Sequence, residues 1–133
     1  MNIEIKKQIS IFMENKPGNL AQICEILERN YINMIGITVA DAVDHAVVRM
    51  VVDDPIKTIH IFGEIGSVVV ESDVVIVQMD KSQPGSLKMI SNALSENEIN
   101  IDYIYGTEIE GKATIILKVS DPVKASKLKI TDV

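Results

Sequence analysis

The chain has 133 residues, of which 47% are hydrophobic and 24% charged, a composition typical of a globular domain with its own core. Its net charge of −6 argues against a nucleic-acid partner, because phosphate binding draws its affinity from Lys and Arg. A single cysteine, Cys24, excludes an intrachain disulfide, and the longest aliphatic runs, of four residues, are too short to cross a membrane. The N-terminal residues lack the apolar run of a signal peptide, so no membrane partner and a cytoplasmic location are expected.

The first elements predicted in chain order are a strand and a helix. Residues 7–13 show the alternation of apolar and polar positions that is typical of a strand. After a Pro-Gly pair, Leu20, Ile23 and Leu27 recur at helical spacing. Asn19 is the predicted N-cap of this helix.

Two strands, a second helix and a further strand follow. The strands are predicted at 32–40 and 46–52, joined by a hairpin turn. Asp54 as N-cap with Pro55 at the first helical position is a strong helix start signal. The run at 67–71 is predicted to be the last strand of the series.

The same series then recurs. A shift of 67 positions aligns Ile9 to Lys57 with the later part of the chain without a gap, and the shared residues include both Pro-Gly pairs and both Asp-Pro pairs. We call the aligned parts the first and the second copy. The order βαββαβ, written twice, predicts an α+β fold of two tandem ferredoxin-like units, with antiparallel sheets and helices on one face. The predicted domains are 1–71 and a C-terminally shortened 72–133, with residues 127–132 as its last strand.

Known catalytic and cofactor motifs are not found. The central strands carry no aromatic residues for base stacking, and the first loops contain no CxxC pair. His45 and His60 lack motif spacing to an acid or a nucleophile. Metal binding by Asp53 and Asp54 is disfavoured against helix capping, and Cys24 is interpreted as a buried thiol beside the apolar helix stripe. We expect no catalytic residue, no metal and no cofactor.

The repeated Pro-Gly corner is the remaining candidate site. Gly18 and Gly85 permit unusual backbone angles and close approach of a ligand. The helix N-terminus that follows offers free N–H groups and partial positive charge, which suit a small carboxylate. Asn33 and Asn100 are expected to lie near the same end and to hold the other group of an amino acid. A tight turn without any ligand explains the same residues equally well.

The chain resembles the ACT domain family. The stretch "ENKPGNLA" at Glu14–Ala21, its partner "PGSLKMISNALSENEIN" and "VDDPIK" at Val52–Lys57 are similar to that family's motifs. The duplicated pattern is similar to small free-standing proteins made of two ACT domains. The resemblance implies binding of an amino acid across a domain interface by the first loop and by the Asn that opens the second strand.

Carried over by position, the resemblance implies ligand-binding residues in both copies. They are Asn15, Gly18, Asn19 and Asn33 in the first copy, and Asp80, Ser82, Gly85, Ser86 and Asn100 in the second. If one site alone binds, the paired amides of the first copy favour that copy.

The resemblance thus implies a non-catalytic regulatory protein that binds a small ligand, an amino acid. It also implies a homodimer and an amino-acid biosynthetic enzyme as a partner. The alternative is a ligand-free interaction module that docks on a metabolic enzyme through an exposed sheet edge.

Overall fold

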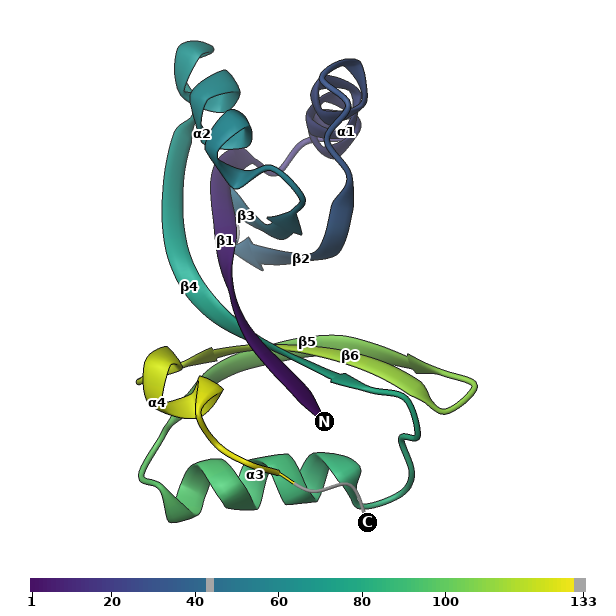
Figure 1. Cartoon of the computed structure of the whole chain (residues 1–133). Helices are drawn as coiled ribbons and strands as arrows, with labels where there is room; N and C mark the ends of the chain where they lie inside the picture. The colour runs from purple at the N-terminus through teal and green to yellow at the C-terminus, as the bar shows by residue number, and fades with distance from the viewer. Residues whose placement is uncertain (43–44, 131–133) are drawn as a thin grey trace. The chain divides into compact units, whose positions relative to one another are not determined.

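The structure is a computed structural model that describes residues 1–42 and 45–130. Its helices and strands are β1 Asn2–Glu14, α1 Asn19–Arg29, β2 Met34–Ala42, β3 His45–Val52, α2 Pro55–Glu64, β4 Val68–Met79, α3 Ser86–Glu96, β5 Ile101–Ile109, β6 Lys112–Val119 and α4 Pro122–Ser126 (Figure 1). The hydrogen-bonded strand order is β2-β3-β1-β4-β6-β5. The predicted α+β class with ferredoxin-like units is confirmed. The predicted turn between the second and third strands falls partly on residues 43–44, which lie outside the described residues.

The chain divides into two compact units that share two long strands. The N-terminal unit is Lys7–Ser72, and the C-terminal unit combines Met1–Lys6 with Asp73–Val133. Strands β1 and β4 therefore each contribute one part to each unit. These compact units differ from the predicted repeat limits, because the first six residues belong to the unit of the second copy.

The N-terminal unit packs two helices on one face of an antiparallel sheet. In the register of β1 with β3, Ile9 pairs with Met50 and Ile11 with Val48, so the four side chains face the same way. All four are buried, and α1 and α2 complete this core. The residues that the two helices contribute are Ile23, Leu27 and Phe62. The alternation in the strand and the helical spacing in α1 thus direct their apolar residues to one core.

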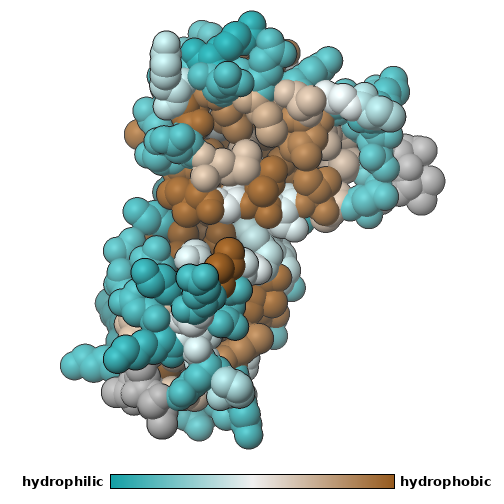
Figure 2. All heavy atoms as spheres, turned by 90° about the vertical axis from the view of Figure 1, so that its right-hand side faces the viewer, coloured by the Kyte–Doolittle hydropathy of each residue, from teal (hydrophilic) through white to brown (hydrophobic). Residues whose placement is uncertain are grey.

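Strand β2 forms the outer edge of this unit and exposes several apolar side chains. Ile35, Ile37 and Val39 are exposed by 49%, 38% and 43%. Figure 2 shows apolar residues gathered on the side of the N-terminal unit where α1 and β2 lie. Ile37 and Val39 pair with the core residues Met50 and Val48, so they lie on the helix-bearing face of the sheet.

The helix starts follow two different rules. Asp54 and Asp121 cap α2 and α4 as predicted, since each side chain accepts a hydrogen bond, of 3.1 and 3.0 Å, from the N–H three residues on. The prediction of Asn19 as N-cap is wrong by one residue, because Gly18 holds that position with a φ of 91°. Gly85 takes the same place before α3 with a φ of 95°.

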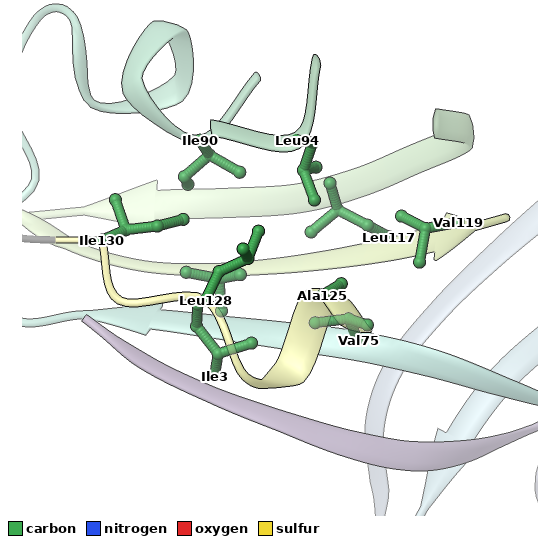
Figure 3. A pocket seen from close by; sticks show the side chains of 10 residues that line it. Ile3, Val75, Ile90, Leu94, Leu117, Val119, Ala125, Leu128 and Ile130 are labelled. Carbon is green, nitrogen blue, oxygen red and sulfur yellow. The ribbon is translucent and has the colours of Figure 1, made fainter. Parts of the chain in front are cut away.

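The C-terminal unit builds its core from both ends of the chain. Met1 and Ile3 of β1, with Leu128 and Ile130 after α4, pack against the buried residues of β4, β6, α3 and α4. Figure 3 shows Ile3, Leu128 and Ile130 pointing toward Val75 and Leu117 around a cavity of about 10 Å³. That volume is close to one water-sized probe, so the cavity is a gap in packing and not a ligand site.

The predicted last strand at 127–132 is wrong over its described part. Lys127 ends α4, and residues 128–130 have no regular structure. Residues 131–132 lie outside the described part of the chain. Because Met1–Lys6 joins the C-terminal unit beside β4, the sheet receives its fourth strand from the beginning of the chain.

Candidate functional site

The loop between β4 and α3 forms one wall of an open pocket in the C-terminal unit. The pocket has a volume of about 590 Å³, within the range of small-molecule sites. Its lining residues are Met79, Ser82, Gln83, Pro84, Gly85, Ser86, Leu87, Ile104, Tyr105, Gly106, Thr107, Glu108, Ala113 and Ile115. Three of the predicted ligand residues, Ser82, Gly85 and Ser86, therefore lie together on it.

The opposite wall is the helix-bearing face of strand β5. Gly106 pairs with Ile115 and Glu108 with Ala113 in the register with β6. Both partner residues belong to the core or pack against it, so Gly106 and Glu108 face the helices. The pocket therefore lies between the start of α3 and the edge strand of the sheet.

The backbone of β6 leaves no room for a side chain at Gly106. A Cβ at this position would overlap the carbonyl oxygen of Thr114 and would lie 2.9 Å from the Cα of Ile115. Both contacts are with backbone, which cannot swing aside. A side chain at position 106 is therefore excluded unless β5 shifts, and this part of the pocket wall is formed by backbone alone.

Polar groups of the loop and the hairpin surround the mouth of the pocket. The Ser86 hydroxyl accepts a 3.0 Å hydrogen bond from the Gln83 N–H, which fixes the corner before α3. The Glu108 carboxylate accepts a 3.2 Å hydrogen bond from the N–H of Gly111. The Ser82 N–H donates to the Gly111 carbonyl, so the loop is tied to the β5–β6 hairpin. No described side chain caps α3, which leaves N–H groups of its first turn for another acceptor.

The corresponding corner of the N-terminal unit is held by two amide side chains. The Asn15 amide donates a 2.7 Å hydrogen bond to the Asp41 carboxylate at the end of β2. The Asn19 amide donates a 2.6 Å hydrogen bond to the backbone carbonyl of Glu14. Both predicted ligand residues therefore use one amide donor within the protein. The neighbouring Lys16 ammonium, 2.6 Å from the Glu14 carboxylate, lowers the pKa of that carboxyl through a hydrogen bond and charge attraction.

The expectation that Asn33 and Asn100 lie near these corners is wrong. Strand β2 runs parallel to β1, because both pair antiparallel with β3, and it therefore starts at the end where α1 finishes. Helix α1 has 11 residues and spans about 16 Å, too far for one amino acid to bridge. The Asn33 N–H instead donates a 3.1 Å hydrogen bond to Asp53 at the end of β3.

The two Asn residues lie in matched surface hollows at the C-terminal ends of α1 and α3. Asn33 shares a hollow of about 380 Å³ with Tyr31 and Cys24, and Asn100 shares one of about 440 Å³ with Glu98. The Asn100 amide donates a 2.9 Å hydrogen bond to Asp102. Cys24 is exposed, so its interpretation as a buried thiol is wrong.

Comparison with known families identifies the chain. The sequence profile of the ACT domain pair matches residues 3–132. The chain belongs to this family. A search of curated protein sequences finds no relative. Among the described residues, no cluster of three or more His, Cys, Asp or Glu is arranged to hold a metal ion, and no helix has the length and hydrophobicity to span a membrane.

Solved structures of several proteins have a similar fold. The chain is 30% identical to the protein BT0572 of Bacteroides thetaiotaomicron, with a TM-score of 0.85, covering 94% of this chain and 86% of that one. The ligand-free regulatory subunit of aspartate kinase from Thermus thermophilus has 15% identity and a TM-score of 0.72, covering 96% and 94%. The alpha and beta subunits of an aspartokinase have 20% identity and a TM-score of 0.66, covering 96% and 93%. At these identities the two kinase structures share the fold.

Sequence reasoning missed the β5 wall of the ACT pocket. Ile104, Gly106 and Glu108 alternate along the strand, a signal that places them on one face. A glycine within a strand pattern also indicates close approach of another backbone. The predicted residue Asp80 is exposed and does not line this pocket.

Proposed function

We propose that the chain is a non-catalytic regulatory protein that binds an amino acid in the pocket between α3 and β5. It consists of two ACT domains with the limits 1–71 and 72–133 in the sequence, and Met1–Lys6 of the first is contributed to the compact unit of the second. The observation that carries this proposal is the meeting of three features in one pocket: an uncapped helix N-terminus, a carboxylate and an apolar floor. An amino acid has the matching three parts, namely a carboxylate, an ammonium group and a side chain.

The polar contacts of the ligand follow from the charges at the pocket. Its carboxylate accepts hydrogen bonds from the N–H groups in the first turn of α3, where the helix dipole favours an anion. Its ammonium group faces Glu108, whose carboxylate has acceptor capacity beyond its bond to Gly111. Its side chain lies against Leu87, Ile104 and Ile115.

Binding at such a site regulates through a shift between conformations or partners. A ligand changes that equilibrium only if it binds one state more tightly than the other. The fold shared with a regulatory subunit of aspartate kinase supports an amino-acid biosynthetic enzyme as the partner. Such enzymes act on free cytoplasmic metabolites, so we propose the cytoplasm as the compartment.

A homodimer is part of the proposal, with pairing at the β2 edge of the N-terminal unit. An outer strand presents unpaired backbone groups, and exposed apolar side chains make it a surface for another chain. Strand β2 carries one acidic residue, Asp41, whereas the edge strand β5 carries two, Asp102 and Glu108. The β2 edge therefore has less of the like-charge repulsion that disfavours pairing of two β5 edges.

A thermal-shift screen against the twenty protein amino acids at millimolar concentration tests the ligand proposal. A ligand at a hundred times its dissociation constant adds about 2.7 kcal/mol of stability, which raises the Tm of a chain of this size by several degrees. We expect one amino acid, or one chemical group of them, to give such a shift. No shift with any of the twenty would overturn amino-acid binding and favour the ligand-free docking module.

The Glu108→Gln variant tests the assignment of the ammonium contact. It removes the charge and keeps the shape, so the affinity for the selected amino acid is expected to fall at least tenfold. Glu110→Gln is the matched control, because Glu110 lies in the adjacent turn and does not line the pocket. Equal affinities of the two variants for the amino acid would contradict the assignment of Glu108 as the ammonium contact.

Light scattering after size-exclusion chromatography tests the dimer. The expected mass is twice the chain mass of 14.7 kDa. Val39→Lys should give the monomer mass, while Ile109→Lys on exposed β5 should leave the dimer intact. A monomer without substitution would overturn the dimer proposal.

A further inference from the structure

Each copy has a corner between the loop before its first helix and the helix-bearing face of its edge strand. The residues that line this corner differ between the two copies. The shift of 67 positions places Leu20 on Leu87 and Ile37 on Ile104, so the apolar parts of both corners are alike. All four side chains are partly exposed, by 37% to 49%. Among the positions that differ, three further pairs change the corner itself.

The first two differences decide whether a hydrogen bond between side chains joins the loop to the edge strand. In the first copy Asn15 and Asp41 are joined by a 2.7 Å hydrogen bond between their side chains. Their counterparts are Ser82 and Glu108. The serine side chain is shorter, and the Glu108 carboxylate bonds to the N–H of Gly111 in its own hairpin. The side-chain bridge of the first copy therefore has no counterpart between Ser82 and Glu108, and the loop of the second copy is tied to its hairpin through the Ser82 N–H and the Gly111 carbonyl.

The third difference concerns the floor of the corner. Val39 pairs with Val48 on the helix-bearing face and is 43% exposed, so its side chain stands in the corner of the first copy. Its counterpart Gly106 has no side chain, and the adjacent backbone of β6 excludes one. The first copy thus has a valine side chain in its corner, whereas in the second copy the pocket of about 590 Å³ is lined at this position by the backbone of Gly106 alone.

We propose that the second copy alone binds the ligand, with one ligand per chain, and that the first copy is closed by the Asn15–Asp41 bridge and by Val39. This inference rests on the proposed function and makes Ser82, Gly106 and Glu108 the residues that decide which copy binds. It reverses the preference for the first copy that its paired amides suggested. Each of those amides donates a hydrogen bond within the protein, to Asp41 and to the Glu14 carbonyl.

Isothermal titration calorimetry with the amino acid that gives the largest thermal shift tests the inference. The unsubstituted protein is expected to bind one equivalent per chain. The double variant Ser82→Asn/Glu108→Asp installs the bridging pair of the first copy and is expected to weaken binding at least tenfold. Asp41→Ala removes the bridge of the first copy, and its affinity is expected to stay within twofold of the unsubstituted protein.

The outcomes separate this inference from the proposed function. Two equivalents per chain, or an affinity lost with Asp41→Ala and kept in the double variant, would overturn the one-site inference while amino-acid binding stands. Absence of binding to any of the twenty amino acids overturns both. The stoichiometry is measured on the unsubstituted chain. If circular dichroism shows that the double variant is unfolded, Ser82→Asn alone replaces it.

Discussion

The ammonium group of Lys57 donates a 2.7 Å hydrogen bond to the backbone carbonyl of Asn30, the residue that ends α1. Lys124 does the same to Asn97 at the end of α3, at 2.8 Å. Lys57 lies in the first turn of α2, and Lys124 lies in the first turn of α4. A cation at a helix C-terminus compensates both the unpaired carbonyl and the negative end of the dipole. The two helices of each unit are therefore joined by a polar contact as well as by the core.

Replacing Lys57 by Met is expected to lower the free energy of unfolding by about 0.5–1 kcal/mol, because the aliphatic stem is kept and the charge-assisted contact is lost. Urea unfolding followed by circular dichroism measures the change. Lys88→Met is the matched control, since Lys88 lies in the first turn of α3, where a cation is unfavourable. Its removal should leave stability equal or slightly higher, and a similar loss in both variants would contradict the assigned role of Lys57.

The contribution of the first residues to the C-terminal unit gives a second prediction. Ile3→Ala should destabilise the protein by about 1–2 kcal/mol, since this partly buried side chain packs against the core of that unit. The loss should appear in native-state hydrogen exchange as faster exchange in β6 than in β3. Ile5→Ala, at an exposed position of the same strand, should change little. Uniform acceleration in both units would argue against this placement of the N-terminal residues.

Glu98 is a third test position, because it adopts a left-handed backbone with a φ of 56° directly after α3. A side chain in this region costs about 1 kcal/mol or more, and glycine avoids that cost. Glu98→Gly is therefore expected to stabilise the protein by up to about 1 kcal/mol in urea unfolding. Glu25→Gly, in the middle of α1, should destabilise it by about the same amount. The same sign for both variants would refute the backbone argument.

Acid stability gives a fourth prediction at the Glu14–Lys16 pair. Lys16 lowers the pKa of Glu14 below its ordinary value of 4.5. A carboxyl with a depressed pKa contributes stability above its unfolded pKa and loses it as the pH falls through the folded one. Glu14→Gln should therefore show a shallower loss of stability than the parent below pH 4.5. The Lys16 and Glu14 side chains are 68% and 65% exposed, so added salt should shrink the difference between Glu14→Gln and the parent. An equal slope in the two proteins would contradict a contribution of this pair to acid stability.

Local signals predicted the elements of this fold well. Alternation and helical spacing depend on contacts close in sequence, and the Asp-Pro pairs began α2 and α4 at the expected residues. The N-cap of α1 was harder to predict. Asn is a favoured N-cap residue, which pointed to Asn19, but Gly18 adopts the left-handed backbone and holds the N-cap position. The predicted strand at 67–71 merged with the next strand into β4, since Glu71, Ser72 and Asp73 include no breaker.

The candidate site was predicted only in part. The loop residues Ser82, Gly85 and Ser86 are adjacent in sequence, and their convergence on one pocket needed no long-range contact. The position of Asn33 depends on strand order, which no local pattern encodes. The participation of residues 1–6 in the C-terminal unit, whose other residues begin at position 73, likewise depends on which sheet edge lacks a strand.

The division of β1 between the two units affects the order in which the protein can fold during synthesis. Residues 7–72 are complete long before the ribosome has made β6, and domains fold as they emerge. At that stage the C-terminal unit, against whose core Met1 and Ile3 later pack, has no sheet that Met1–Lys6 could join. Residues 1–6 are therefore made before residues 7–72 but are buried after them, and their apolar side chains are open to chaperones until β4 and β6 have been made.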